Sequence, residues 1–295
     1  MGPLAVSSPV GLKNILIATD YSPASNRAIG FAAALAARFE ATLYALHADE
    51  PVNYAVPAQY WKAERDASRI AAGQFGAELR KLFPGVKSEI VVAEGPAWQV
   101  INRTVKDKEI DLLVLGTRGR RGIPKFLLGS AAEEILRRAT CPVLTVGPRA
   151  LSWEVLPLEG APILYVTDFS PEAYAAAPLA IAWACELNAT LTLLHVLEDG
   201  AALNFNRPLE PTDAARHLLE RLLPEDAGSR FAYRLQVERG QAAEKIVDTA
   251  EGIRAALIVA GARGPAGFPG ATEHFSTSTL HKVIAQAPCA VLSAR

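Results

Sequence analysis

The chain has 295 residues, about twice the ~150 of a typical domain, so its length alone predicts two domains. Hydrophobic residues make up 50% of the chain and charged residues 21%, with 21 glycines and 20 prolines, a composition that excludes collagen-like, disordered and low-complexity proteins. The net charge of −1 combines a basic first half, with 19 Lys and Arg against 14 Asp and Glu, and an acidic second half, with 11 against 17. The excess of basic residues in the first half is not accompanied by a basic run interleaved with aromatic residues, so nucleic acid is not an expected partner.

The first half alternates short apolar runs with longer stretches of helical periodicity, as in a parallel sheet with helices on both faces. The expected strands are 13–18, 42–47, 88–93, 111–115 and 142–146. A helix is expected from Pro23 to Phe39, with Ser22 as its N-cap and proline at its first position. A second helix is indicated by four apolar residues on one face, namely Ala71, Phe75, Leu79 and Leu82.

The second half repeats this plan. At a shift of 148 residues the sequence Thr19-Asp20-x-Ser22-Pro23 returns as Thr167-Asp168-x-Ser170-Pro171. At a shift of 145, Leu112, Val114 and Gly116 return as Leu257, Val259 and Gly261. We therefore expect an α/β protein with two tandem doubly wound domains, residues 10–148 and 160–295, joined by a linker over 149–159.

Open parallel sheets bind ligands beyond the carboxyl ends of their strands, so the candidate site residues follow the strands. After the fourth strand the sequence reads Gly116-Thr-Arg-Gly119, and nine residues later Gly129-Ser130 opens a helix. Glycines allow close approach of backbone to a ligand, and the free amides of a helix N-terminus favour an anion. Positive charge in the same loop comes from Arg118, Arg120, Arg121 and Lys125.

Asp20, at the end of the first strand, is placed to accept hydrogen bonds from a ribose or an adenine. Glycines after a buried strand are also common as simple turn residues, but their combination with Gly129-Ser130 favours a phosphate site.

The pattern Gly116-x2-Gly119-x9-Gly129-Ser130 resembles the ATP-binding motif of the universal stress protein family. The Thr-Asp-x-Ser-Pro opening, Gly95-Pro96 before the third helix and the Cys-Pro-Val-Leu ending match that family as well, and the resemblance covers both halves. It implies Rossmann-like domains of the adenine nucleotide alpha hydrolase-like type, each with a five-stranded sheet in the order 3-2-1-4-5. It also implies pairing through the last strand, which two tandem domains can satisfy internally, and leaves a homodimer open.

The resemblance further implies ATP, with Mg²⁺, as the ligand of the first domain. The adenine is then expected near Ala18, Asp20, Ala48 and Leu115, and the phosphates on Gly116, Gly119, Gly129, Ser130 and Ala131, with Arg118 in the same loop. Relatives that bind ATP act as stress-response sensors or regulators, so nucleotide is expected to order Arg120–Leu128 and change a surface seen by an unidentified protein partner. Two alternatives stay open: a slow Mg²⁺-dependent ATPase or phosphotransferase in which Arg118 and Ser130 hold phosphates, and a scaffold that binds another small ligand or none. No Ser-His-Asp order, HExxH motif or paired-carboxylate cleft identifies catalytic residues.

The second half departs from the motif. Gly261-Ala-Arg-Gly264 is kept, but twelve residues follow it, and Thr277-Ser278 stands where the first half has Gly129-Ser130. The longer loop contains no Lys or Arg, and a β-branched residue disfavours the backbone conformation that a tight helix start requires. We expect the second domain to bind ATP poorly or not at all, with a degenerate site, or one for a different ligand, as the lesser alternative.

Three cysteines, Cys141, Cys185 and Cys289, are too few for a disulfide framework and fit a reducing, cytoplasmic location. Neither a signal peptide nor an apolar stretch of the ~20 residues that cross a bilayer is present, so we expect no membrane association. Cys141 and Cys289 precede the last strand of each half and are expected to be buried small residues, with redox sensing as the alternative. His47 and His195 close the second strands without Cys or His neighbours at ligand spacing, and no metal site is expected.

Overall fold

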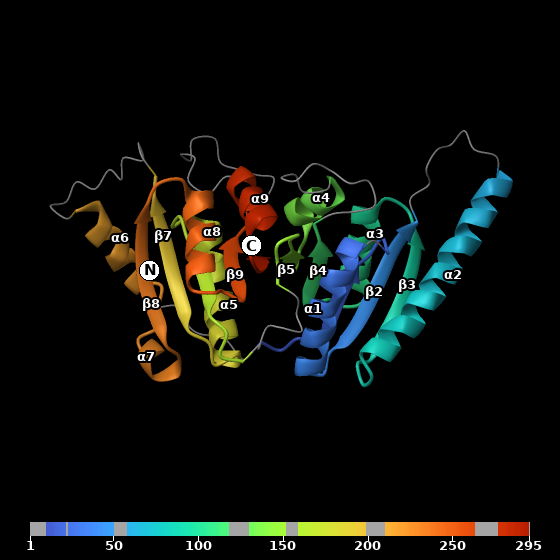
Figure 1. Ribbon diagram of the computed structural model, residues 1–295, viewed down its shortest axis with the longest axis horizontal. Helices are drawn as coiled ribbons and strands as arrows, with labels where there is room; N and C mark the ends of the chain where they lie inside the picture. Colours follow the sequence, from blue (N-terminus) through green and yellow to red (C-terminus); the bar gives the residue numbers. More distant parts are fainter. Residues whose placement is uncertain are drawn as a thin grey trace. The chain divides into compact units, whose positions relative to one another are not determined.

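The computed structural model describes residues 10–21, 23–49, 58–117, 130–151, 159–198, 210–262 and 277–294. These residues form two compact units, the first built largely from Gly11 to Val146 and the second from Gly147 onward. Each unit is an α/β domain (Figure 1). Among the helices of the described ranges, none is both long and apolar enough to span a membrane.

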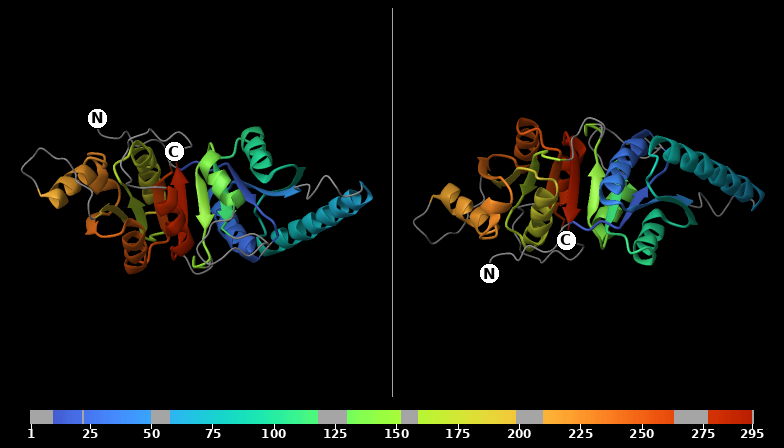
Figure 2. Two further views of the ribbon diagram at one scale, coloured as in Figure 1. Left: turned by 90° about the horizontal axis from the view of Figure 1, so that it is seen from above. Right: turned by 90° about the horizontal axis from the view of Figure 1, so that it is seen from below.

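The first domain contains five parallel strands in the order β3-β2-β1-β4-β5, which confirms the expected 3-2-1-4-5 arrangement. Its elements in chain order are β1 (Asn14–Ala18), α1 (Pro23–Phe39), β2 (Thr42–Asp49), α2 (Ala58–Leu82), β3 (Ser88–Glu94), α3 (Ala97–Asp107), β4 (Leu112–Gly116), α4 (Ser130–Arg138) and β5 (Val143–Val146). Helices α1 and α2 cover one face of the sheet, and α3 covers the other, where it packs against α4 (Figure 2).

The second domain repeats the arrangement with the order β8-β7-β6-β9-β10. Its elements are β6 (Ile163–Val166), α5 (Pro171–Glu186), β7 (Leu191–Leu197), α6 (Pro211–Glu220), α7 (Ala227–Arg230), β8 (Tyr233–Arg239), α8 (Ala242–Gly252), β9 (Leu257–Gly261), α9 (Thr277–Gln286) and β10 (Ala290–Ala294). The internal repeat seen in the sequence is thus a repeat of fold.

The core of each domain lies on the central strand. In β1 the side chains of Ile15, Leu16 and Ile17 are fully buried, and in β6 those of Ile163 and Leu164 are as well. A strand paired on both edges and covered on both faces has no solvent-facing side chains, so it reads as a continuous apolar run. This burial explains why both central strands were recognisable without any alternation of polar and apolar residues.

Most element boundaries agree with the sequence expectations to within two residues. Helix α1 spans Pro23–Phe39 as expected, and α5 begins with Ser170 as N-cap, whose side chain accepts a hydrogen bond from the Ala173 amide at 3.3 Å. Helix α2 differs because it begins at Ala58, well before Ala71, where the apolar spacing starts. Apolar periodicity marks only the part of a helix that contacts the sheet, and Figure 1 shows α2 extending past the edge of the sheet.

The start of the expected linker belongs structurally to the second domain. The Arg149 guanidinium donates to the Gln286 carbonyl at 3.0 Å and pairs with the Glu251 carboxylate at 2.6 Å. The Leu151 amide donates to the Pro288 carbonyl at 3.0 Å. Residues 149–151 are therefore held against the second domain.

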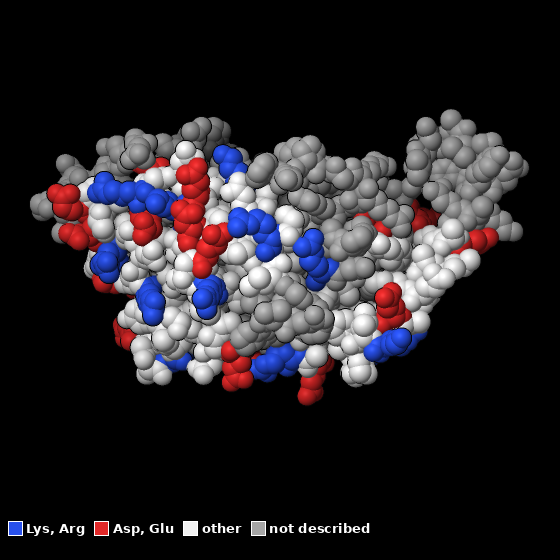
Figure 3. All heavy atoms as spheres, in the orientation of Figure 1, with Lys and Arg blue, Asp and Glu red and all other residues white. Residues whose placement is uncertain are grey.

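Charged side chains are interspersed on the described surface. On the face shown in Figure 3, Lys and Arg lie among Asp and Glu along both domains. The basic excess of the first half is therefore not gathered into a stripe among the described residues of that face.

Gly261, at the carboxyl end of β9, is a glycine because the first turn of α5 packs directly on it. A Cβ at this position would lie 2.5 Å from the Ala173 nitrogen and 2.6 Å from the Glu172 oxygen, both backbone atoms that cannot rotate away. Gly261 lies within a strand and is not among the described glycines with positive φ. The requirement is one of space, not of φ.

Replacing Gly261 with Ala should therefore destabilise the protein by about 1–3 kcal/mol, because α5 must shift away from β9. Urea unfolding followed by circular dichroism measures this loss. Gly252→Ala is the matched control, since an added Cβ meets nothing within 4 Å at this helical position. This substitution also lowers the conformational entropy of the unfolded chain, so it should not destabilise the protein. A Gly261→Ala protein as stable as the control would contradict the packing argument.

Candidate functional site

The candidate site lies at the edge of the first domain where β1, β2 and β4 end. Ala18 pairs in register with Leu115 of β4 and Leu46 of β2, and Gly116 follows Leu115 at the end of β4. Ala48 lies two residues beyond Leu46 in the same direction. The structure thus brings Ala18, Ala48, Leu115 and Gly116 to one edge, and Asp20 follows β1 at that edge. Leu115 is buried, whereas the other four residues are partly exposed.

A histidine fixes the end of β1. The Thr19 amide donates to the Leu46 carbonyl at 2.9 Å, and the Thr19 carbonyl lies 2.8 Å from Nδ1 of His47. Because a carbonyl oxygen only accepts, Nδ1 carries the hydrogen. The His47 ring also stacks on Tyr21, with ring centroids 4.5 Å apart. His47 therefore has a structural role at the rim of the candidate site.

The chain turns sharply after Thr19. Tyr21 has a φ of 59°, and its amide donates to the Thr19 hydroxyl at 3.0 Å. Non-glycine residues with positive φ are uncommon and persist only where their surroundings hold them. Here the hydroxyl of Thr19 and the rings of His47 and Phe75 hold Tyr21, and the turn leads the chain from Asp20 into α1.

The Asp20 carboxylate is oriented by the first turns of α1. Ser25, which is 5% exposed, donates from Oγ to Oδ1 of Asp20 at 2.5 Å. A hydroxyl that donates to a carboxylate forms a short, charge-assisted bond, which restricts the rotation of the acid. Asp20 thus presents a carboxylate with a defined direction at the edge of the sheet.

A second acidic residue lies close by, at the end of β2. The Asp49 Oδ1 atom accepts a hydrogen bond from Oγ of Ser68 in α2 at 2.7 Å and lies 3.5 Å from Nε2 of His47. The Asp49 carbonyl accepts from the amide of Gly95, whose φ of 131° only glycine adopts readily. Asp49 therefore joins β2, α2 and the start of α3.

The remaining expected site residues are only partly visible. Arg118, Gly119 and Gly129 lie outside the described residues, as does Arg120–Leu128. Helix α4 begins at Ser130, as expected, so the backbone of Ser130 and Ala131 is at a helix N-terminus; nothing is described of their side chains. The phosphate part of the expected site stays a prediction.

The second domain keeps the contact that holds the end of its central strand but differs in the polar side chains that follow the strand ends. The Nδ1 atom of His195 again lies 2.8 Å from the Thr167 carbonyl, and the ring of Phe169, at φ 61°, takes the place of Tyr21. Oδ1 of Asp168 instead accepts from the amide of Ser170 at 2.9 Å. Ala173 stands where the first domain has Ser25, so the hydroxyl that holds Asp20 has no counterpart.

Asp49 likewise has no counterpart, because Leu197 occupies the matching position in β7. Helix α9 begins at Thr277, as expected for the motif position, whereas Arg263 lies outside the described residues. The second domain therefore keeps the first acid, as Asp168, but has a counterpart neither of the serine that holds Asp20 nor of Asp49.

Sequence reasoning missed Ser25, Ser68 and Asp49. The signal for Ser25 was its spacing of five residues from Asp20 across the start of α1, which places a hydroxyl in the first turn of the helix, facing back toward the strand end. The link between Ser68 and Asp49 depends on how α2 returns over the sheet, and no local spacing announces it.

The structure offers no resident metal centre in the residues that it describes, because no three His, Cys, Asp or Glu side chains there converge. All three cysteines are free thiols. Burial raises the pKa of Cys141 to about 11 and that of Cys289 to about 12, so both thiols resist ionisation. Reaction as a thiolate is disfavoured at both sites.

Comparisons with known proteins agree with one another. A family model described as the universal stress protein family matches residues 11–147 and 161–295. Universal stress protein Rv2623 of Mycobacterium tuberculosis is 30% identical over 271 residues, which is 87% of this chain and 88% of that protein. Universal stress protein MJ0531 of Methanocaldococcus jannaschii is 34% identical over 139 residues, 45% of this chain and 81% of that protein.

Among solved structures, a universal stress protein from Archaeoglobus fulgidus superimposes with a TM-score of 0.69. The superposition covers 96% of this chain and 98% of that one, at 19% sequence identity. This likeness confirms the tandem Rossmann-like fold.

Cys289 should react far more slowly than Cys185 with a thiol-specific disulfide reagent at pH 8. Cys289 is fully buried and its raised pKa leaves almost no thiolate, whereas Cys185 is partly exposed. Single-cysteine variants, each keeping one of the three thiols, give the rates separately. Rapid modification of Cys289 in the native protein would contradict a purely structural role, and full reaction in urea is the control that the thiol is intact.

Proposed function

The chain belongs to the universal stress protein family, and from that premise we propose that its first domain binds ATP and that the protein acts as a nucleotide-dependent regulator of a stress response. The observation that carries the proposal is the convergence at one sheet edge. There the oriented carboxylate of Asp20, the end of β4 at Gly116 and the N-terminus of α4 at Ser130 coincide with the spacing Gly116-x2-Gly119-x9-Gly129-Ser130.

The residues present fit an adenine nucleotide. Ala18 and Ala48 are small and partly exposed, which leaves room for a flat base beside the strand ends, and Leu115 supplies apolar surface below them. Oδ1 of Asp20 is engaged by Ser25, which fixes the direction in which the carboxylate meets a ribose hydroxyl or the exocyclic amine of adenine. These groups position the nucleoside.

The phosphates are assigned to the loop and helix that follow β4. The amides at the start of α4 and the backbone of Gly116, Gly119 and Gly129 would donate to phosphate oxygens, and Arg118 would add charge. Mg²⁺, when bound, would neutralise part of the triphosphate charge. We assign no protein ligand to Mg²⁺ because no described cluster of acids could hold it alone.

We propose that the second domain does not bind ATP in the same way. Three of its departures lie at the edge in question: Ala173 in place of Ser25, Leu197 in place of Asp49, and Thr277 in place of Gly129. In addition, Gly261 is required by the packing of α5, so its presence is no sign of a phosphate site. The second domain is then a structural partner of the first, with internal pairing or homodimerisation as part of the proposal.

The proposed location is the cytoplasm, supported by three free cysteines in a chain without a disulfide. The regulatory readout would be a protein partner that distinguishes the nucleotide-bound from the nucleotide-free chain. A slow ATPase or phosphotransferase remains the competing reading of the same site, and measurement of ADP released per bound ATP separates it from a pure binding protein.

Calorimetric titration of nucleotide-stripped protein with ATP and Mg²⁺ should give one site per chain. Gly129→Val should abolish that site, because a β-branched residue obstructs the start of α4 where phosphate is expected. Thr277→Val is the matched control, since it changes the corresponding position of the second domain and should leave the titration unchanged. Two sites per chain would contradict the division between the domains, and no site would contradict ATP binding altogether.

Ser25→Ala should weaken ATP binding about fivefold to tenfold, because Asp20 loses the hydroxyl that orients it, at a cost of about 1 kcal/mol. The variant reproduces what the second domain already has at Ala173. Ser229→Ala is the control: its hydroxyl donates to the Asp226 carbonyl at 2.7 Å in the second domain, far along the chain from the site. Equal affinity of Ser25→Ala and the native protein would remove Asp20 from the binding site.

A further inference from the structure

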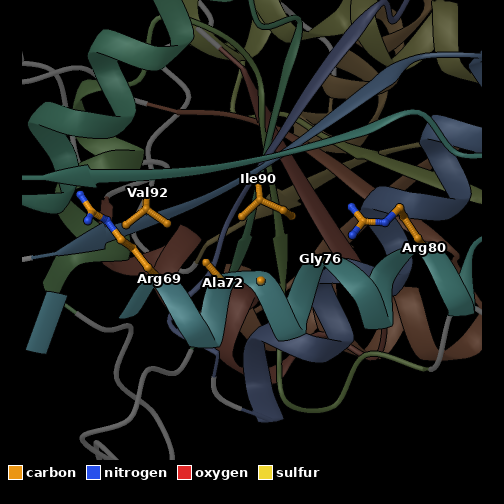
Figure 4. A pocket seen from close by; sticks show the side chains of 7 residues that line it. Arg69, Ala72, Gly76, Arg80, Ile90 and Val92 are labelled. Carbon is orange, nitrogen blue, oxygen red and sulfur yellow. The ribbon is translucent and has the colours of Figure 1, made fainter. Parts of the chain in front are cut away.

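A groove runs along the outer edge of the first domain, between α2 and β3. It has a volume of about 310 Å³ and is lined by Arg69, Ala72, Gly73, Gly76, Arg80, Ile90 and Val92. Figure 4 shows Arg69 and Arg80 reaching from α2 toward the strand on either side of Ile90, while Ile90 and Val92 point toward the helix. The groove is separate from the candidate nucleotide site, since it shares no residue with it.

The helix side of the groove is open because its residues are small. Gly76 follows Gly73 by three positions and Ala72 by four, so it is a neighbour of both on the helix surface, and all three residues line the groove. A Cβ at Gly73 would meet nothing within 4 Å, so there is empty space in front of it, whereas a Cβ at Gly76 would lie 2.9 Å from Ile90. The two glycines thus form the middle of the groove, one in the open part and one at the floor.

Each end of the groove carries a guanidinium. Within the described residues neither Arg69 nor Arg80 has an ion-pair or hydrogen-bond partner. The two positions are eleven residues apart on α2, about 16 Å along the helix axis. An occupant that satisfies both therefore carries negative charge at two points and apolar groups between them.

The strand side of the groove is an open sheet edge. In the described chain β3 pairs only with β2, so its outer backbone amides and carbonyls have no strand partner. The apolar side chains of Ile90 and Val92 are only half-buried beside it. Exposed sheet edges accept extended peptides as an added strand, with main-chain hydrogen bonds for affinity and alternate side chains for specificity.

The second domain differs in the helix that packs beside its outer strand, β8. Helix α6 packs on β8 and β7. Leu219 on this helix and Leu222, three residues later, are both fully buried. In the described residues of the second domain, large buried leucines thus lie at this helix, whereas the corresponding helix of the first domain has Ala72, Gly73 and Gly76 at its groove. The groove is a property of the first domain and does not follow from the fold itself.

We propose that the groove between α2 and β3 binds an extended acidic peptide segment of a partner protein, which adds to the free edge of β3. Apolar side chains of the peptide would face Ile90, Val92 and Gly73, and carboxylates would reach Arg69 and Arg80. Since a strand advances about 3.3 Å per residue, two acids four residues apart lie on one face and span about 13 Å, within reach of both flexible guanidiniums. The proposal does not depend on ATP binding.

A random twelve-residue peptide library displayed on phage and panned against the purified full-length chain tests this assignment. Enriched peptides should alternate apolar and polar residues and carry Asp or Glu about four positions apart. A synthetic copy of an enriched peptide, followed by fluorescence anisotropy, should slow deuterium exchange of the β3 amides. No enrichment, or unchanged exchange in β3, would overturn the proposal.

Variants locate the peptide. Gly73→Leu should place a side chain in the groove, since an added Cβ meets nothing within 4 Å, and should reduce affinity about tenfold or more. Gln74→Leu changes the next residue, which is no part of the groove lining, and should leave the affinity unchanged. Arg69→Glu and Arg80→Glu should each weaken binding about fivefold or more, with Arg103→Glu on α3 as the charge-matched control. Peptides that bind Gly73→Leu as tightly as the native chain would overturn the site. Binding of dodecanoate that Gly73→Leu blocks, without any peptide, would overturn the peptide in favour of an anionic amphiphile.

Discussion

The pairing of one central strand with neighbours on both edges determines where the strand-end residues of the candidate nucleotide site lie. Because β1 is hydrogen-bonded to β2 and to β4, its end cannot move independently of theirs. The carbonyl of Thr19 then comes within reach of His47, and the next residue, Asp20, leaves the sheet at the point where β4 also ends. The second domain obeys the same constraint through β6, and it reproduces the contact between Thr167 and His195 at the same distance. The side chains at the strand ends would contact a ligand, but the backbone hydrogen bonds between the strands determine where those side chains lie.

Features encoded by neighbouring residues were accessible from the sequence. The apolar runs of the strands, the proline at the start of α1 and the repeated Thr-Asp-x-Ser-Pro segment act within a few residues, and the 3-2-1-4-5 order followed from a family resemblance. What the sequence left open depends on segments that meet only after folding. Gly261 resembles a ligand-binding glycine until α5 is seen to pack on it, and the bond from Ser68 to Asp49 joins a helix and a strand. The groove between α2 and β3 is harder still to predict from the sequence, because the small residues Ala72, Gly73 and Gly76 that line it produce no apolar periodicity.

The two domains differ at their edges far more than in their cores. Both central strands are fully buried and both histidines hold the end of the central strand, because any change there would leave backbone groups unpaired. Near the strand ends, Ser25 is matched by Ala173 and Asp49 by Leu197. Helix α6 contains the fully buried Leu219, whereas α2 has Gly73 and Gly76 at its groove. Such substitutions leave the ladder intact. The two domains can therefore share one architecture while the first keeps polar residues at its strand ends and a groove beside α2, and the second has apolar residues at the matching strand-end positions.

Helix α2 connects the two open edges of the first domain. Ser68 holds Asp49 beside the candidate nucleotide site, and the next residue, Arg69, stands at one end of the groove. Consecutive residues of a helix point about 100° apart, so a rotation or shift of α2 that changes one contact necessarily changes the direction of the other. If ATP and a peptide both bind, any effect of one on the affinity of the other must be equal in both directions, because binding free energies around a closed cycle sum to zero. Two described contacts tie α2 to the strand ends, the hydrogen bond between Ser68 and Asp49 and the ring contact between Phe75 and Tyr21, and such coupling would pass through them.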